Sequence, residues 1–200
     1  MNLRRGYTMT ARAQAVEATR TGILDALVQL SAERLLSDVA LDDVAARAGV
    51  SVQTLLRHFG GRDALIEAAV QHALGAVTEE RQAPAGDVDE ALRVLVDHYE
   101  QRGEGVLLLL AQEQVDARVR QVTDAGRRLH RDWVAEVFAP LLPHAATGRD
   151  ESIDLLVVVT DVYAWKLLRL DRGLSRPRTQ QRLQRLVRAV LADLGSSTEE

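Results

Sequence analysis

Apolar residues recur at helical spacing along most of the chain, and the clearest short example is residues 41–48. The apolar positions of this segment form one stripe of a helix: Leu41, Val44, Ala45 and Ala48. Gly49 follows as a residue that ends a helix by adopting a positive φ at little cost. Ser51 then offers an N-cap to a second short helix, residues 52–58. The pattern predicts two short helices joined by a tight turn.

The same periodicity predicts helices in the rest of the chain. An earlier helix carries an apolar stripe made of Ile23, Leu24, Leu27 and Val28. A fourth helix covers residues 62–80, and Pro84 and Gly86 end the pattern that it belongs to. Five further helices are expected at residues 88–102, 104–113, 116–142, 151–170 and 177–194. Breaks are expected at Gly103, residues 140–148 and residues 173–177. These patterns predict an all-α protein of about nine helices.

Composition agrees with a helical protein that has a buried core, because 46% of the residues are apolar and only 4% are aromatic. The expected divisions are an N-terminal domain, a connecting helix and a C-terminal helical domain, at residues 1–62, 63–81 and 87–195. Residues 1–18 are expected to precede the first helix as a basic arm or a solvated terminus. The arginines of this arm are Arg4, Arg5 and Arg12.

Two helices joined by a short glycine-containing turn are the plan of a helix-turn-helix, whose second helix lies in the major groove of DNA. Leu55 and Phe59 are four residues apart in that helix and should face the core. On the outward side, the Gln53 amide can pair with adenine, and the methyl groups of Val52 and Thr54 can pack on thymine. Arg57 and His58 can reach phosphate or guanine. The predicted DNA-binding residues are Ser51, Val52, Gln53, Thr54, Arg57, His58 and Arg62. A helical hairpin without a DNA contact is the alternative.

Residues 19–74 resemble the N-terminal domain of the TetR family of bacterial transcriptional repressors. The resemblance rests on VAARAGVS, TLLRHF and GRDAL, and its most discriminating positions are Thr54, His58, Phe59 and Arg62. The family commonly has a tyrosine where this chain has Leu56, and a serine or threonine cap where it has Ala40. Gly60 and Gly61 replace the usual proline and capping residue. These departures predict weaker binding to DNA phosphates than is usual in the family.

The resemblance implies a C-terminal domain that binds a small-molecule inducer and forms dimers. Residues suited to line the inducer pocket are Tyr99, Leu109, His130, Trp133, Val137, Phe138, Tyr163 and Trp165. Aromatic side chains with a few polar tips are common in ligand pockets. Large apolar side chains at helical spacing also form ordinary protein cores, so a plain core is the alternative.

The last two predicted helices indicate a homodimer without help from the resemblance. Residues 155–170 are apolar on nearly every side, and residues 183–194 carry a continuous stripe. The predicted interface consists of Leu156, Val159, Tyr163, Leu167, Leu183, Leu186, Val187, Val190, Leu191 and Leu194. A second copy would cover this surface as a four-helix interface, unless the core of one subunit absorbs it. Asp161 and Lys166 interrupt the first of these segments, which argues against a membrane span.

The net charge of −4 is unevenly distributed along the chain. Residues 1–62 hold eight arginines and six acidic residues, a net charge of +2, so the remainder carries −6. A basic end on an acidic body is expected when only one domain meets phosphate. The chain has no cysteine, and its first residues lack the apolar segment of a signal peptide, so we expect a cytoplasmic protein.

The sequence carries no motif of an enzyme. Its five histidines show no metal-binding spacing, and no phosphate loop, GxSxG turn or cysteine nucleophile is present. We therefore expect no catalytic residue, no metal and no cofactor. The expected function is a ligand-responsive, DNA-binding transcriptional regulator of repressor type. It is expected to bind a palindromic operator as a homodimer and to be released by an unknown small-molecule inducer. The alternative is a helical ligand-binding or protein-binding dimer with weakened or lost DNA binding.

Overall fold

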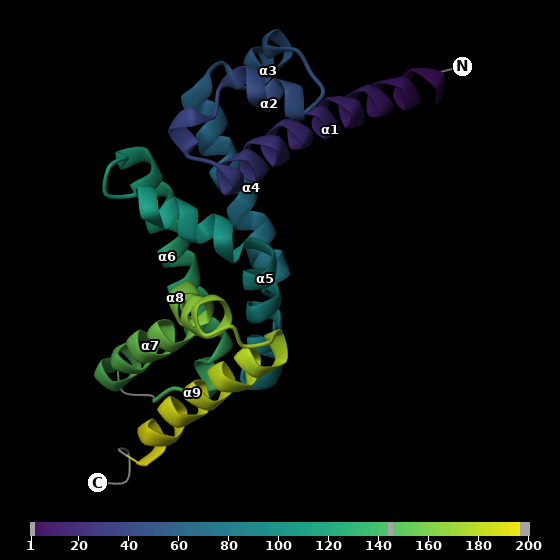
Figure 1. Ribbon diagram of the computed structural model, residues 1–200. Coiled ribbons are helices and arrows are strands. Elements are labelled where there is room, and N and C mark those ends of the chain that lie inside the picture. Colours follow the sequence, from purple (N-terminus) through teal and green to yellow (C-terminus); the bar gives the residue numbers. More distant parts are fainter. Residues whose placement is uncertain (1–2, 144–145, 197–200) are drawn as a thin grey trace. The chain divides into compact units, whose positions relative to one another are not determined.

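The computed structural model describes residues 3–143 and 146–196. Within these residues the backbone forms helices and turns without a strand, which confirms the all-α prediction (Figure 1). The α-helices are α1 (Leu3–Glu33), α2 (Leu41–Arg47), α3 (Val52–Phe59), α4 (Arg62–Glu80), α5 (Val88–Gln112), α6 (Ala117–Val137), α7 (Ala146–Thr160), α8 (Val162–Lys166) and α9 (Arg176–Ser196). Between them lie the 3-10 turns η1 (Leu36–Asp38) and η2 (Ala139–Leu141) and the π-helical turn η3 (Leu167–Asp171). The chain forms two compact units, Met1–Ala73 and Leu74–Glu200, and α4 contains the division.

In the N-terminal unit, α1 packs against α2 and α2 packs against α3. The buried apolar side chains of this unit include Ile23 and Leu30 of α1, Val44 of α2, Leu55 and Phe59 of α3, and Leu65 of α4. Burying one such side chain stabilises the fold by about 1.5–3 kcal/mol. The prediction that Leu55 and Phe59 face the core is therefore confirmed.

The turn between α2 and α3 has the predicted local structure. Gly49 adopts a φ of 67°, which is costly for residues with a Cβ, and Val50 N–H donates to the Ala45 carbonyl at 2.9 Å. Ser51 caps α3, because its Oγ accepts the Thr54 N–H at 3.1 Å. These local bonds determine where α3 starts and which way it leaves the turn.

Helix α1 is longer than predicted, because it begins at Leu3. The arginines expected to precede the first helix, Arg4, Arg5 and Arg12, therefore belong to its backbone. The segment contains no proline, and its alanines, arginines, glutamine and glutamate favour a helix. The expectation of an arm before the helix is corrected accordingly.

Helix α5 is continuous through Gly103, where a break was predicted. A glycine inside a helix costs about 1 kcal/mol relative to alanine, which is the reason that a break was expected. Here the missing side chain makes room for Trp165, since a Cβ built at Gly103 would lie 2.6 Å from the Trp165 Cζ3 atom. The glycine at this position serves close packing between helices.

Two other predicted helices are divided differently in the structure. The helix expected at residues 116–142 ends at Val137, and η2 follows with Pro140 inside it, because proline is not tolerated in a helix interior. The helix expected at residues 151–170 begins earlier and is interrupted at Asp161. The Asp161 carboxylate accepts the Tyr163 N–H at 2.8 Å and so starts α8.

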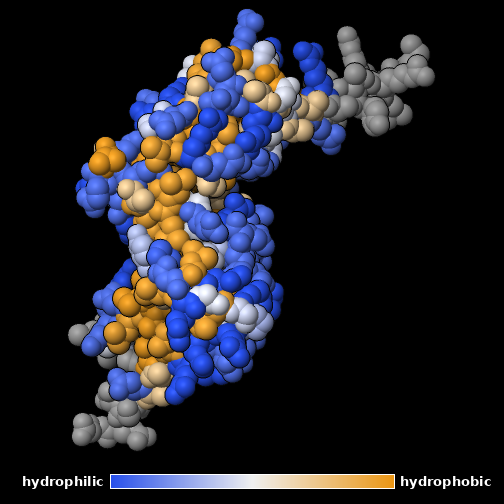
Figure 2. Space-filling model, viewed as in Figure 1, coloured by the Kyte–Doolittle hydropathy of each residue, from blue (hydrophilic) through white to orange (hydrophobic). Residues whose placement is uncertain are grey.

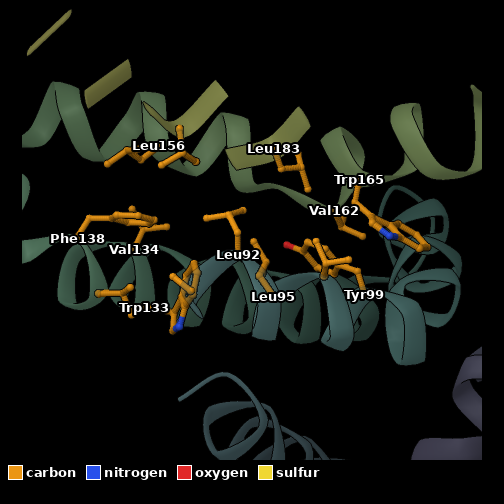
Figure 3. Packing of buried hydrophobic residues seen from close by; sticks show 14 of the residues in the cluster. Leu92, Leu95, Tyr99, Trp133, Val134, Phe138, Leu156, Val162, Trp165 and Leu183 are labelled. Atoms are coloured by element: carbon orange, nitrogen blue, oxygen red, sulfur yellow. The ribbon is translucent and has the colours of Figure 1, made fainter. Parts of the chain in front are cut away.

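The core of the C-terminal unit is built from α5, α6, α7, α8 and α9. In Figure 3, Leu156 and Leu183 point toward Leu92 and Leu95, and all four side chains are fully buried. Aromatic residues complete this core at Tyr99, Trp133, Phe138 and Trp165. None of the helices in the described ranges combines the length and apolar character that crossing a membrane requires.

Candidate nucleic-acid interface

Helix α3 has one buried side and one exposed side. Leu55 and Phe59 point into the core, whereas Gln53 and Arg57 are exposed and Val52, Thr54 and His58 are partly exposed. Gln53 and Arg57 are four residues apart and therefore lie on the same side of the helix. Five of the predicted DNA-contacting side chains thus remain available to a partner outside this unit.

The start of α3 is held by two neighbouring hydroxyl groups. Ser51 Oγ and Thr54 Oγ1 lie 3.0 Å apart and share a hydrogen bond, in addition to the cap bond from the Thr54 N–H. Each hydroxyl oxygen keeps lone pairs, and whichever group is not the donor keeps its proton for an outside acceptor. The pair therefore orients the first turn of α3 and still offers hydrogen-bonding capacity at the surface.

The other end of α3 is anchored by Phe59 and closed by glycine. The guanidinium of Arg20, on α1, lies 4.6 Å from the centre of the Phe59 ring, within the range of a cation–π contact. Gly60 ends the helix with a φ of 77°. The helix is therefore held at both ends, which keeps its exposed side chains in a defined orientation.

Arg62 has a structural contact that the sequence did not indicate. Its Nη2 donates to the Leu36 carbonyl at 2.6 Å, and its Nη1 donates to the Val39 carbonyl. Both acceptors belong to the segment between α1 and α2, 23 and 26 residues away in sequence. The predicted phosphate contact at Arg62 thus falls on a side chain that ties α4 to the entry of α2.

Ala40 occupies the N-cap position of α2 without a capping hydroxyl. The Asp43 carboxylate compensates by accepting the Ala40 N–H at 3.0 Å, and this bond lowers the pKa of Asp43. Arg34 lies 3.3 Å from the same carboxylate. The predicted loss of phosphate donors still holds as a prediction, since Ala40 has no hydroxyl and Leu56 is an exposed apolar side chain.

The ion pairs on the surface of the N-terminal unit do not include Arg57. Arg47 makes a bidentate ion pair with Glu33, with both N–O distances 2.9 Å. The Nε2 atom of His72 lies 2.6 Å from Asp25 Oδ1. Arg57 has no ion-pair partner among the residues that the structure describes. Its cation is therefore free to meet an external anion.

The residues predicted to line an inducer pocket are mostly brought together in the C-terminal core. That group consists of Tyr99, Trp133, Val137, Phe138 and Trp165, with His130 buried against Trp133. Leu109 is partly buried, and Tyr163 stands apart with half of its surface exposed. No group of three or more histidine, aspartate or glutamate side chains in the described part of the chain is placed to hold a metal ion.

The predicted dimer residues divide into buried and exposed sets. Leu156, Leu183 and Val187 are completely buried within the protomer, which corrects their predicted place in an interface. Val159, Val190 and Leu191 are partly buried, and Leu194 lies outside the residues whose side chains are described. The exposed members are Tyr163, Leu167 and Leu186. The structure adds Leu155 and Val158 of α7 and Leu170 of η3 to the exposed apolar side chains. Figure 2 shows apolar surface in the region of α7 and α8.

Comparisons with known proteins agree with this geometry. A model of the family described as bacterial regulatory proteins, tetR family, matches residues 23–69. The HTH-type transcriptional repressor Rv3405c of Mycobacterium tuberculosis is 34% identical over 159 residues, which cover 68% of this chain and 80% of that protein. The HTH-type transcriptional repressor LfrR of Mycolicibacterium smegmatis is 31% identical over 140 residues, which cover 68% of this chain and 70% of that protein.

Solved structures show the same fold. A tetR-family transcriptional regulator from Streptomyces coelicolor superposes with a TM-score of 0.69 at 20% identity, covering 90% of this chain and 83% of that one. The family match coincides with the unit in which α2 and α3 are joined by the glycine turn and α3 presents its polar side. The chain belongs to the tetR family of bacterial regulatory proteins and is a DNA-binding transcriptional regulator, not an enzyme.

Proposed function

We propose that this protein is a repressor that binds a palindromic operator as a homodimer, in the cytoplasm, and that a small molecule releases it. The observation that carries the DNA-binding part is the polar side of α3, where Gln53 and Arg57 are exposed next to the capped first turn. The relatives named as transcriptional repressors support the direction of regulation.

Gln53 and Arg57 have different roles in this proposal. The Gln53 amide reads a base, because it can pair with adenine through two hydrogen bonds. Arg57 neutralises a phosphate, because its cation is exposed and lacks an ion-pair partner within the described ranges. Ser51, Val52, Thr54 and His58 complete the contact surface, and Arg62 supports it from behind through Leu36 and Val39.

A gel-shift assay on the DNA upstream of the protein's own gene tests these roles. Gln53→Ala should change which operator variants bind best, whereas Arg57→Ala should weaken all of them and reduce the salt slope of log K by about 1. Arg182→Ala, an exposed arginine on α9, is the matched control and should leave binding unchanged. A folded dimer that binds no duplex at low salt would favour a ligand-binding or protein-binding dimer instead.

Dimerisation is supported by the exposed apolar side chains of α7, α8, η3 and α9. Val158 and Leu167 expose 67% and 61% of their surface and belong to a group of exposed apolar side chains on these neighbouring elements. Grouped apolar side chains at the surface mark an interaction site, whereas a single exposed one does not. Two recognition helices related by twofold symmetry also read successive major grooves, so a dimer implies a palindromic site. The proposed interface is built around Leu155, Val158, Tyr163, Leu167, Leu170 and Leu186.

Sedimentation of two variants tests the interface. Val158→Glu and Leu167→Glu should each yield a folded monomer that has lost operator binding, because these side chains contribute little to the protomer core. Val115→Glu is the control, since Val115 is 88% exposed in the segment between α5 and α6. Dimers that survive both substitutions would contradict the proposed interface.

Ligand response is proposed as a shift between two conformers. A small molecule that binds the C-terminal unit more tightly in the conformer with wrongly spaced recognition helices would lower operator affinity. Helix α4 is suited to transmit this change because it belongs to both units. A ligand that binds tightly without changing operator affinity would refute the coupling.

A further inference from the structure

Arg81 is a buried cation that follows directly after α4. Its side chain is only 4% exposed, and its guanidinium carbon lies 4.2 Å from the centre of the Trp133 ring. The Trp133 Nε1–H donates to the Arg81 carbonyl at 2.8 Å, so side chain and backbone are both held against the same indole. The guanidinium carbon thus lies over the indole ring, within the range of a cation–π contact.

The donors of Arg81 are only partly satisfied by the protein. Nη2 donates to His130 Nδ1 at 2.8 Å, and Nε is buried without any hydrogen-bond acceptor. An unsatisfied buried donor on a charged group is among the more costly arrangements in a protein interior. Such a group calls for an explanation beyond packing.

No carboxylate of the described residues forms an ion pair with Arg81. The neighbouring Glu80 is committed to Arg102 and to His98, with its Oε2 3.1 Å from His98 Nδ1. Buried arginines are usually paired with an acid, because removing an unpaired charge from water is strongly unfavourable. The positive charge of Arg81 therefore lacks a counter-ion in the part of the chain that the structure describes.

The two histidines near Arg81, His130 and His98, are neutral at physiological pH. Burial and the charge of Arg81 lower the pKa of His130 to about 3 and that of His98 to about 4. Since His130 Nδ1 accepts from Arg81, its proton lies on Nε2, which faces Thr160 Oγ1 at 3.1 Å. The Thr160 hydroxyl donates onward to the Leu156 carbonyl at 2.6 Å. In this orientation the neutral Nδ1 of His130 accepts from Arg81, although an anionic oxygen would be the stronger acceptor.

We propose that Arg81 is the anchor for the carboxylate of an organic acid, which binds in the C-terminal unit as the effector. The proposal rests on the ligand response put forward above and deepens it by naming the chemical class of the ligand. One carboxylate oxygen takes the free Nε–H and the other takes Nη2–H, displacing His130 as the weaker, neutral acceptor. A carboxylate is planar and singly charged, so it matches both the shape and the charge of one guanidinium.

The surroundings favour an acid with an apolar, aromatic body. Trp133 stacks with His130 at a ring separation of 5.9 Å, and Tyr99 lies 5.9 Å from Trp165. The Tyr99 hydroxyl donates to the Thr160 carbonyl at 2.9 Å, so it is occupied and contributes mainly its ring. Aromatic side chains near a single cation match, in polarity, a ligand that has one carboxylate and an apolar body.

The test uses the full-length protein with benzoate, hexanoate and indole-3-acetate, and the corresponding neutral amides as matched probes. Two readouts are followed, the proton–nitrogen NMR signal of Arg81 Nε and the melting temperature. At least one acid should shift the Arg81 signal and, at ten times its Kd, raise the melting temperature by about 3–6 °C, whereas its amide should do neither. Arg81→Met should abolish the response, and Arg128→Met, at an exposed arginine of α6, should retain it.

Several results would overturn the assignment. No response to any of the acids up to their solubility limits, equal responses to acids and amides, or a response that survives in Arg81→Met would each do so. Inorganic phosphate that shifts the Arg81 signal when the acids do not would overturn the choice of carboxylate. If Arg81→Met fails to fold, the NMR signal of the unmodified protein still decides.

Failure of this inference is separable from failure of the proposed ligand response. An acid that shifts the Arg81 signal without changing operator affinity would leave the site in place and refute the response. A neutral compound that releases the operator without moving the Arg81 signal would support the ligand response and refute Arg81 as its anchor.

Discussion

Replacing Gly103 with alanine should destabilise the protein, although alanine favours helices. The new Cβ would lie 2.6 and 2.8 Å from the Cζ3 and Cη2 atoms of Trp165. Trp165 is only 2% exposed, and its Nε1–H donates to Glu100 Oε1 at 3.0 Å, so the ring has little freedom to move aside. Overpacking of this kind costs about 1–3 kcal/mol. Helix propensity returns about 1 kcal/mol, which leaves a net loss of up to about 2 kcal/mol.

The assay is urea unfolding at a constant protein concentration, followed by tryptophan fluorescence. Gly126→Ala is the matched control, because Gly126 lies inside α6 and a Cβ there would meet nothing within 4 Å. The control should gain about 0.4–1 kcal/mol. Adding Trp165→Phe to Gly103→Ala should recover part of the loss, as a double-mutant cycle would reveal. If Gly103→Ala gained as much stability as the control, the argument from close packing would be refuted.

Ser51→Ala should cost about 1 kcal/mol of unfolding free energy, because α3 loses its cap, and an unchanged urea midpoint would contradict this. Arg62→Ala should leave two carbonyls without their donor, lower stability by about 1–3 kcal/mol and weaken binding to every operator alike. Full recovery of both properties in Arg62→Lys would show that charge, and not the two-carbonyl contact, is what matters. Stability should also fall on acidification, since His98 and His130 have pKa values of about 4 and about 3 in the fold against 6.5 as the ordinary value. The unfolded chain then binds protons first, so each histidine should remove about 1.4 kcal/mol per pH unit as the pH drops below 6.5 toward 4. His98→Gln should flatten this slope in thermal unfolding, and a pH-independent stability would refute the reasoning.

Predictions about the DNA-facing unit depended on signals that act over a few residues. The positive φ of Gly49, the cap at Ser51 and the inward side of α3 are each decided by neighbours within one helical turn. Arg62 was beyond such reasoning, because its acceptors at Leu36 and Val39 are brought to it by the packing of α1, α2 and α4. The hydrogen bond from the Ala40 N–H to Asp43 was not predicted either, because it depends on side-chain geometry at the start of α2.

Spacing and caps are local properties of the chain, so they were enough to predict the helical class, the helix-turn-helix and the positions of most helices. Which faces of the apolar helices are covered depends instead on how the helices pack against one another. Leu156 is buried and Leu155 is exposed, although the two are adjacent leucines in one apolar run. Packing between distant segments makes that choice, and it also leaves Arg81 buried without a counter-ion, which no pattern of neighbouring residues could reveal.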